Sequence, residues 1–130
     1  MKATELMVGD WVCLKDDTKC EFPLKVDGVL TDDISLEGEG FLGGVDGLVR
    51  PIPLTPEILE KNGFIKVNSQ RYDYGYPDTD CYIKVNPKKN MIHMNGRNAN
   101  SNLYSHSFVH ELQRALRLCG LNELADNFKV

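Results

Sequence analysis

The sequence lacks any long apolar run. No stretch approaches the ~18 consecutive apolar residues that a membrane-spanning helix needs. The N-terminal segment carries Glu5 and Asp10 where a secretory signal would need an apolar core. Internal repeats and low-complexity tracts are also missing. We therefore expect a folded protein of the cytoplasm that has no membrane partner.

Closely spaced cysteine pairs are missing too. The four cysteines, Cys13, Cys20, Cys81 and Cys119, form no Cys-x-x-Cys motif, which is a common signature of zinc sites and redox sites. Disulfides are rare in a reducing cytoplasm, where thiols usually pack as small apolar groups. The sequence therefore predicts four free thiols, most of them packed.

Motifs for nucleotide binding and nucleophilic catalysis are absent. The glycine-rich segment 38–47 has neither the Lys-Ser/Thr ending of a P-loop nor the flanking strand and helix of a dinucleotide-binding fingerprint. No serine lies in a nucleophile-elbow pattern. We predict no catalytic residue and no cofactor, and we expect a non-enzymatic protein.

Positive charge is scarce in the first half of the chain. Residues 1–63 contain 6 Lys+Arg and 13 Asp+Glu, a net charge of −7, whereas residues 64–130 contain 9 and 6, a net charge of +3. The overall charge of −4 argues against a protein that coats nucleic acid. Such asymmetry can mark a surface that binds a partner, or it can simply keep a small protein in solution.

The residues that are present predict an α+β fold in two parts. Residues 1–54 contain short β-forming segments separated by acidic and glycine-rich turns, which predicts a small SH3-like β-barrel unit. Thr55 is a good N-cap and Gly63 a good stop, so 55–63 is predicted to be a connector helix. Residues 64–130 predict an antiparallel β-meander with a C-terminal helix packed on it. The two parts could also form one compact domain.

The boundaries of the predicted elements follow from β-forming runs and apolar spacing. The expected strands are residues 10–15, 22–30, 34–37, 48–52, 64–67, 71–74, 81–85 and 91–94. Segment 38–47 is expected to be a loop or a bent strand, and segment 95–100 a polar loop. Apolar residues at helical spacing predict a helix at 105–119. Trp11 is expected to anchor the core of the first part.

A His-Glu pair lies at the start of the predicted C-terminal helix. A zincin helix needs a second histidine four residues after the first, but the residue four after His110 is Arg114, which cannot bind zinc. His106 lies four residues before His110, and His93 on the preceding strand could supply a third ligand. These three histidines are weak metal candidates. The pattern favours solvated histidines, so we expect no bound metal, and a metal-dependent hydrolase is the least favoured function.

A second set of candidates combines aromatic and basic side chains. The set consists of Tyr72, Tyr74, Lys84, Lys88, Lys89 and Arg97. Aromatic rings stack on bases while lysine and arginine bind phosphates, so the set could bind nucleic acid. Alternation along a strand places Tyr72 and Tyr74 on the same face. The other interpretation is that these tyrosines are partly core and the lysines protect a sheet edge.

Three segments carry a resemblance to a known family. They are VGDWV at 8–12, IPLTPEILEKNGF at 52–64 and VHELQ at 109–113. Their order resembles a family of short, uncharacterised bacterial proteins found in prophages and mobile elements of gut anaerobes. The resemblance spans nearly the whole chain, and the central segment is the most specific. It implies a bacterial, cytoplasmic accessory role, no transferable catalytic residue, and a structural helix start at 109–113. We therefore predict a module that binds another macromolecule, with a protein as the first choice and nucleic acid as the alternative.

Overall fold

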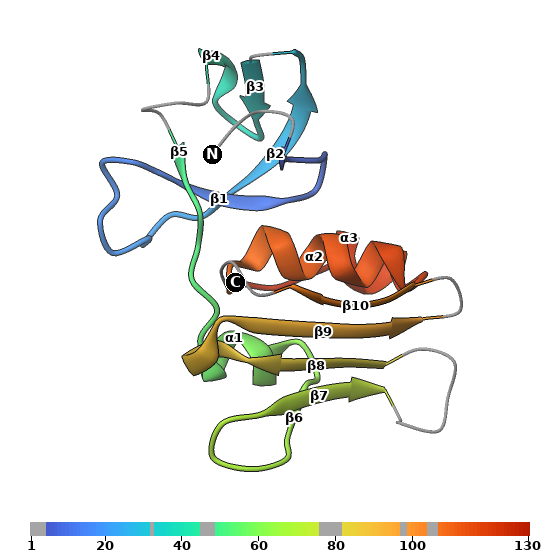
Figure 1. Ribbon diagram of the computed structural model, residues 1–130. Helices are drawn as coiled ribbons and strands as arrows, with labels where there is room; N and C mark the ends of the chain where they lie inside the picture. The colour runs from blue at the N-terminus through green and yellow to red at the C-terminus, as the bar shows by residue number, and fades with distance from the viewer. Residues whose placement is uncertain (1–4, 32, 45–48, 76–81, 97–98, 104–106) are drawn as a thin grey trace. The chain divides into compact units, whose positions relative to one another are not determined.

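The fold is α+β, as the sequence predicts. The computed structural model describes residues 5–31, 33–44, 49–75, 82–96, 99–103 and 107–130. These residues form two antiparallel sheets and a few short helices (Figure 1). The chain divides into two compact units, residues 1–52 and residues 53–130. Within the described ranges, no helix has both the length and the hydropathy needed to cross a bilayer.

The first unit is a five-stranded antiparallel sheet. Its strands are β1 (Trp11–Leu14), β2 (Leu24–Val29), β3 (Asp33–Leu36), β4 (Gly40–Gly44) and β5 (Val49–Arg50), in the order β4-β3-β2-β1-β5. The strands enclose an apolar core made of Leu6, Val12, Val26, Ile34, Leu36 and Val49. The pairing of β2 with β3 shifts register between Val26 and Gly28, and such irregularities bend a sheet. A closed SH3-like barrel stays a prediction.

Trp11 lies outside the core of the first unit. Alternation along β1 places Val12 in the core and Trp11 on the opposite face, where its cross-strand partner is Lys25. The Lys25 Nζ atom lies 5.2 Å from the centroid of the Trp11 ring. The prediction of a core tryptophan was therefore wrong, because a strand of four residues does not reveal which of its faces is buried.

The second unit contains an antiparallel meander, as predicted. Its strands are β6 (Ile65–Lys66), β7 (Tyr72–Gly75), β8 (Tyr82–Asn86), β9 (Met91–Gly96) and β10 (Ala99–Leu103), in the order β10-β9-β8-β7-β6. A 3-10 turn, η2 (Pro87–Lys89), joins β8 to β9. The expected polar loop at 95–100 was wrong for residues 95–96 and 99–100, because β9 continues to Gly96 and β10 begins at Ala99, and residues 97–98 lie outside the described residues. Pairing with β9 outweighs the low β-propensity of this asparagine-rich segment.

The helices of the second unit begin and end at residues suited to those positions. They are α1 (Pro56–Lys61), α2 (Val109–Leu118) and α3 (Asn122–Asp126). The Oγ1 atom of Thr55 accepts a hydrogen bond of 3.3 Å from the amide of Ile58, which caps α1. Both longer helices end at a glycine with positive φ, Gly63 at 85° and Gly120 at 82°. The amide of the residue after each glycine then bonds the carbonyl five residues earlier, in the Schellman pattern.

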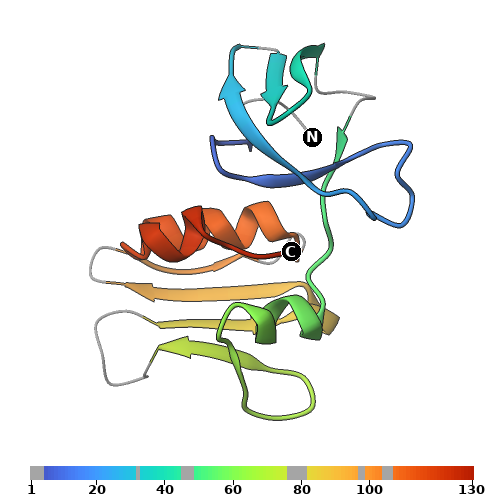
Figure 2. The ribbon, with the colours of Figure 1, turned by 180° about the vertical axis from the view of Figure 1, so that it is seen from behind.

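The helices of the second unit lie together on one face of its sheet (Figures 1 and 2). Helix α2 contacts β9 and α3. Its apolar stripe is completely buried, with no exposed surface at Val109, Leu112, Ala115 or Leu116. The facing strand residues Ile83, Val85, Ile92 and Met94 are also buried. The predicted packing of the C-terminal helix on the meander is therefore confirmed, although α2 begins at Val109 rather than at 105.

Candidate functional site

The face of the second sheet that lies away from these helices carries a group of side chains that range from buried to exposed. Cross-strand pairing places Ile65 opposite Asp73, Asp73 opposite Lys84, and Lys84 opposite His93, so these side chains share one face. We call this surface the open face and define it by Ile65, Val67, Arg71, Asp73, Tyr82, Lys84 and His93.

An ion pair occupies one side of the open face. The Arg71 Nε atom lies 3.1 Å from Asp73 Oδ1, and Arg71 Nη2 donates a 3.1 Å hydrogen bond to Asp73 Oδ2. The Nη2 hydrogen bond satisfies Asp73 Oδ2, whereas Arg71 Nε and Asp73 Oδ1 make an ion-pair contact without hydrogen-bond geometry. The Asp73 side chain is 12% exposed and the Arg71 side chain 34%, so the carboxylate is shielded from water and the guanidinium only in part. Arg71 and Asp73 therefore neutralise one another and add no net charge to the face.

The rest of the open face is aromatic, aliphatic and weakly basic. The rings of Tyr82 and His93 lie side by side on adjacent strands, with centroids 6.4 Å apart. The Lys84 Nζ atom lies 5.2 Å from the Tyr82 ring centroid, within range of a cation–π contact. Ile65 and Val67 are 68% and 49% exposed. The two aliphatic residues and the aromatic pair therefore share one face, with β7 and the Arg71–Asp73 ion pair between them.

The structure divides the residues predicted to bind nucleic acid between two faces. Tyr72 is buried, and Tyr74 lies on the helix-covered face with its ring 5.3 Å from that of Phe64. Neither ring lies on the open face, where Tyr82 takes their place as the aromatic side chain beside Lys84. Lys88 and Lys89 are exposed in η2. Arg97 lies outside the described residues.

The histidine candidates are not brought together. His93 lies on the open face, whereas His110 lies on α2, against the other face of the sheet. His110 is only 7% exposed, and its ring stacks on that of Phe108 at 6.0 Å. The expected solvated position of His110 was therefore wrong, because the first turn of α2 is packed. Glu111 Oε1 accepts a 3.3 Å hydrogen bond from the Phe108 amide at the helix start. His106 lies outside the described residues.

The prediction of four free thiols was wrong for one pair. Cys13 on β1 and Cys20 in the following loop form a disulfide, with Cα atoms 5.6 Å apart. Cys119 carries a thiol, and Cys81 lies outside the described residues. Within the described ranges, the only group of three or more metal-ligand side chains is Cys13, Asp17 and Cys20, whose ligand atoms lie within 4.8 Å of one another. Six residues separate the two cysteines, a spacing that no common motif signals.

Asp17 organises the loop that joins β1 to β2. Its Oδ1 and Oδ2 atoms accept hydrogen bonds from the amides of Glu21 (2.9 Å) and Phe22 (2.8 Å). Arg50, on β5, donates to the backbone carbonyl of Asp17. The amide of Phe22 is the main cause that lowers the pKa of Asp17, followed by the amide of Glu21 and the charge of Arg50.

We expect this loop to loosen in acid. Because the folded state lowers the pKa of Asp17, the ionised carboxylate stabilises the loop fully above the ordinary aspartate pKa. This contribution is lost as the pH falls through the depressed value. The amide signals of Glu21 and Phe22 in a nuclear magnetic resonance titration should report the change. In the Asp17→Asn variant, the chemical shifts of these two amides should not change over the same pH range. If they still change, another titrating group causes the loosening.

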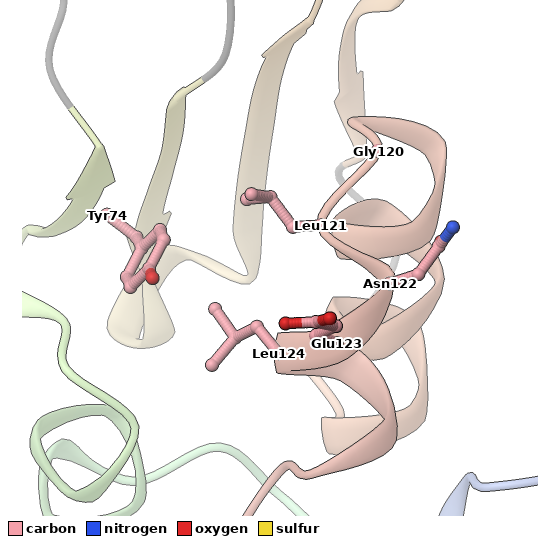
Figure 3. Close-up of a pocket in the computed structure, with 6 residues that line it drawn as sticks. All are labelled: Tyr74, Gly120, Leu121, Asn122, Glu123 and Leu124. Atoms are coloured by element: carbon pink, nitrogen blue, oxygen red, sulfur yellow. The ribbon is translucent and has the colours of Figure 1, made fainter.

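A small pocket lies on the helix-covered side, between β7 and the turn from α2 to α3. It has a volume of about 470 Å³ and is lined by Tyr74, Gly120, Leu121, Asn122, Glu123 and Leu124. In Figure 3 the side chains of Leu121 and Leu124 point toward Tyr74, whereas Asn122 points away. Sequence patterns did not reveal this pocket, because its two sides are distant in the chain. Its lining combines apolar and polar surface, with the Glu123 carboxylate as its charged group.

Comparisons with known proteins found no family model that matches the chain, no similar curated protein and no matching solved structure. The resemblance of three segments to a family of short bacterial proteins therefore stays a prediction.

Proposed function

We propose that this chain is a non-enzymatic accessory protein that binds another protein through the open face of its second sheet. The composition of that face carries the proposal. Exposed Ile65 and Val67 lie on the same surface as the aromatic pair Tyr82 and His93. Exposed apolar and aromatic side chains that share one face with charged groups are typical of protein-binding surfaces. Tyrosine also contributes strongly to binding at the centre of such surfaces.

The charge of the open face favours a protein over nucleic acid. Arg71 is neutralised by Asp73, so Lys84 is the remaining permanent cation among the residues that define the face. Surfaces that bind nucleic acid are usually strongly positive, since affinity depends on the number of phosphates that are neutralised. Weak binding of single-stranded nucleic acid is the second candidate. Tyr82 beside Lys84 supports it, because a ring next to a cation can stack on a base.

The biological setting is part of the same proposal. The resemblance to short bacterial proteins of mobile elements supports an accessory role in a bacterial cytoplasm. It supplies no substrate or catalytic residue, which agrees with a binding function. We propose no membrane partner and no cofactor.

We expect a change on the open face to abolish partner capture. The double variant Ile65→Asp, Tyr82→Ala removes an exposed aliphatic and an aromatic side chain from the face. Loss of such central contacts typically costs at least ~2 kcal/mol of binding energy, so capture should fall more than about tenfold. The measurement is affinity capture from a lysate of the source organism, followed by binding titrations with the purified partner.

The matched control is Leu118→Asp. Leu118 is 53% exposed on α2, away from the open face, so the same type of substitution should leave capture unchanged. Nuclease treatment should not release the partner. Equal losses in both variants would contradict the location of the surface. Release by nuclease, together with sub-micromolar oligonucleotide binding that Lys84→Glu abolishes at physiological salt, would favour the nucleic-acid function instead.

A further inference from the structure

The loop between β1 and β2 of the first unit brings two cysteines together. Cys13 is completely buried, and Cys20 is half-buried. Their Cα atoms lie 5.6 Å apart, a separation typical of disulfides. We propose that Cys13 and Cys20 are a reversible dithiol–disulfide site, which a low-molecular-weight disulfide oxidises and a low-molecular-weight thiol reduces.

The loop has its own hydrogen bonds, so it can hold the two sulfur atoms close together without the covalent bond. The Asp17 amide donates to the Leu14 carbonyl (3.0 Å), and the Cys20 amide donates to the Asp17 carbonyl (3.0 Å). The Asp17 carboxylate and the side chain of Arg50 add the further bonds described above. A dithiol that stays preorganised after reduction can re-form its disulfide, because the second thiol is already beside the first.

The disulfide lies outside the main apolar cluster of the first unit, although Cys13 is itself a buried residue. That cluster consists of Leu6, Val12, Val26, Ile34, Leu36 and Val49, and neither cysteine belongs to it. Alternation along β1 places Val12 in the core and Cys13 on the opposite face. The Cys13 thiol can stay packed as a small apolar group after the sulfur–sulfur bond breaks, so we expect both redox states to keep the same fold. A reversible site needs this property, whereas a purely structural disulfide does not.

The two cysteines differ in how a reagent can reach them. Cys20 is half-buried whereas Cys13 is completely buried, so we expect a reagent to reach Cys20 first. Cys20 also has a φ of 51°, in the left-handed region that residues other than glycine rarely adopt. The loop thus holds Cys20 in an uncommon backbone conformation, with its side chain directed at Cys13. Unusual conformations that the surrounding structure maintains are often found at functional positions.

The oxidation proceeds by two thiol–disulfide exchanges. The Cys20 thiolate attacks one sulfur of the small disulfide, which forms a mixed disulfide and releases one small thiolate. The Cys13 thiolate then attacks the Cys20 sulfur, forms the intramolecular bond and releases the second small thiolate. The cysteine pair loses two electrons and the small disulfide gains them, and the two protons of the cysteines end on the two released thiols. Reduction is the reverse sequence.

The test uses the full-length chain, purified with a reductant and then equilibrated in buffers of oxidised and reduced glutathione. A background with Cys81→Ser and Cys119→Ser leaves only the proposed pair. We expect the chain to lose two hydrogen masses on oxidation, with the bond mapped to Cys13 and Cys20, and to recover them when the buffer is made reducing. Trp11 is the only tryptophan, lies two residues from Cys13, and should report the change by its fluorescence.

Circular dichroism separates a reversible site from a structural bond. The reduced chain, and the variant Cys13→Ser, Cys20→Ser, should keep the spectrum of the oxidised chain. Loss of the β signal in both would overturn the proposal, because the bond would then be required for folding. A pair that remains a dithiol in the most oxidising buffer would also overturn it. So would one equivalent of zinc that co-purifies with the reduced chain and blocks oxidation, since Cys13, Asp17 and Cys20 would then form a metal site.

Discussion

Leu112→Ala and Leu116→Ala should each lower the free energy of unfolding of the second unit by ~2–5 kcal/mol. Both side chains are fully buried on α2 and face the sheet, so truncation removes apolar contacts and leaves a cavity. A unit of this size typically loses roughly 4–8 °C of Tm for each kcal/mol. Chemical denaturation and differential scanning calorimetry should therefore detect either substitution readily.

Leu118 provides the matched control for these substitutions. It lies on the same helix but is 53% exposed, so Leu118→Ala should change the stability by less than ~0.5 kcal/mol. The three variants delete the same atoms and differ only in burial. If Leu112→Ala and Leu116→Ala melt like the parent, α2 is not packed on β9 as described. If Leu118→Ala is equally destabilising, the loss does not depend on burial against the sheet, since alanine is the better helix former and propensity would not cause it.

Local sequence signals predicted the helices and most strands of this fold. Thr55 and Gly63 mark the ends of α1, and Gly120 ends α2, because capping and positive φ are requirements of a few neighbouring residues. The apolar spacing along α2 also identified its buried face, since a helix of ten residues repeats its pattern several times. Such features need no knowledge of distant parts of the chain.

Features that depend on distant pairing were missed. The strand β10 consists largely of polar residues, and only its pairing with β9 makes it a strand. The position of Trp11 outside the core depends on which face of β1 the other strands cover. The approach of Cys20 to Cys13 requires the β1–β2 loop to fold back under hydrogen bonds from Asp17 and Arg50.

The candidate surface was predicted in part. Lys84 was identified from its place beside aromatic residues, and the structure places it on the open face. Tyr72 and Tyr74 were correctly assigned to a common face of their strand, but the helices of the unit cover that face. Alternation predicts which residues lie together, whereas the choice of the buried face depends on tertiary packing. Tyr82 and His93 become neighbours only through the register of β8 and β9.

Asn62 lies at the C-terminal end of α1, and its side chain binds the C-terminal segment. Its Nδ2 atom donates to the carbonyl oxygens of Ile58 (2.8 Å) and Lys129 (2.7 Å). Its Oδ1 atom accepts a hydrogen bond of 2.7 Å from the Lys129 amide. Asn62 is only 7% exposed, and the neighbouring Phe128 is 1% exposed. This one side chain therefore connects the end of α1 to the chain terminus across 67 positions of sequence.

Asn62→Ala should lower the free energy of unfolding by ~2–4 kcal/mol, since the partner groups at Lys129 lose their bonds in a partly buried site. The matched control is Asn127→Ala. Asn127 also ends a helix and donates from Nδ2 to the carbonyl of Glu123 (2.9 Å), but that hydrogen bond is exposed, so its loss should cost less than ~0.5 kcal/mol. Hydrogen exchange locates the effect, because the Lys129 amide should lose its protection only in Asn62→Ala. If that amide exchanges equally fast in the parent, the side chain of Asn62 does not hold the C-terminal segment in solution.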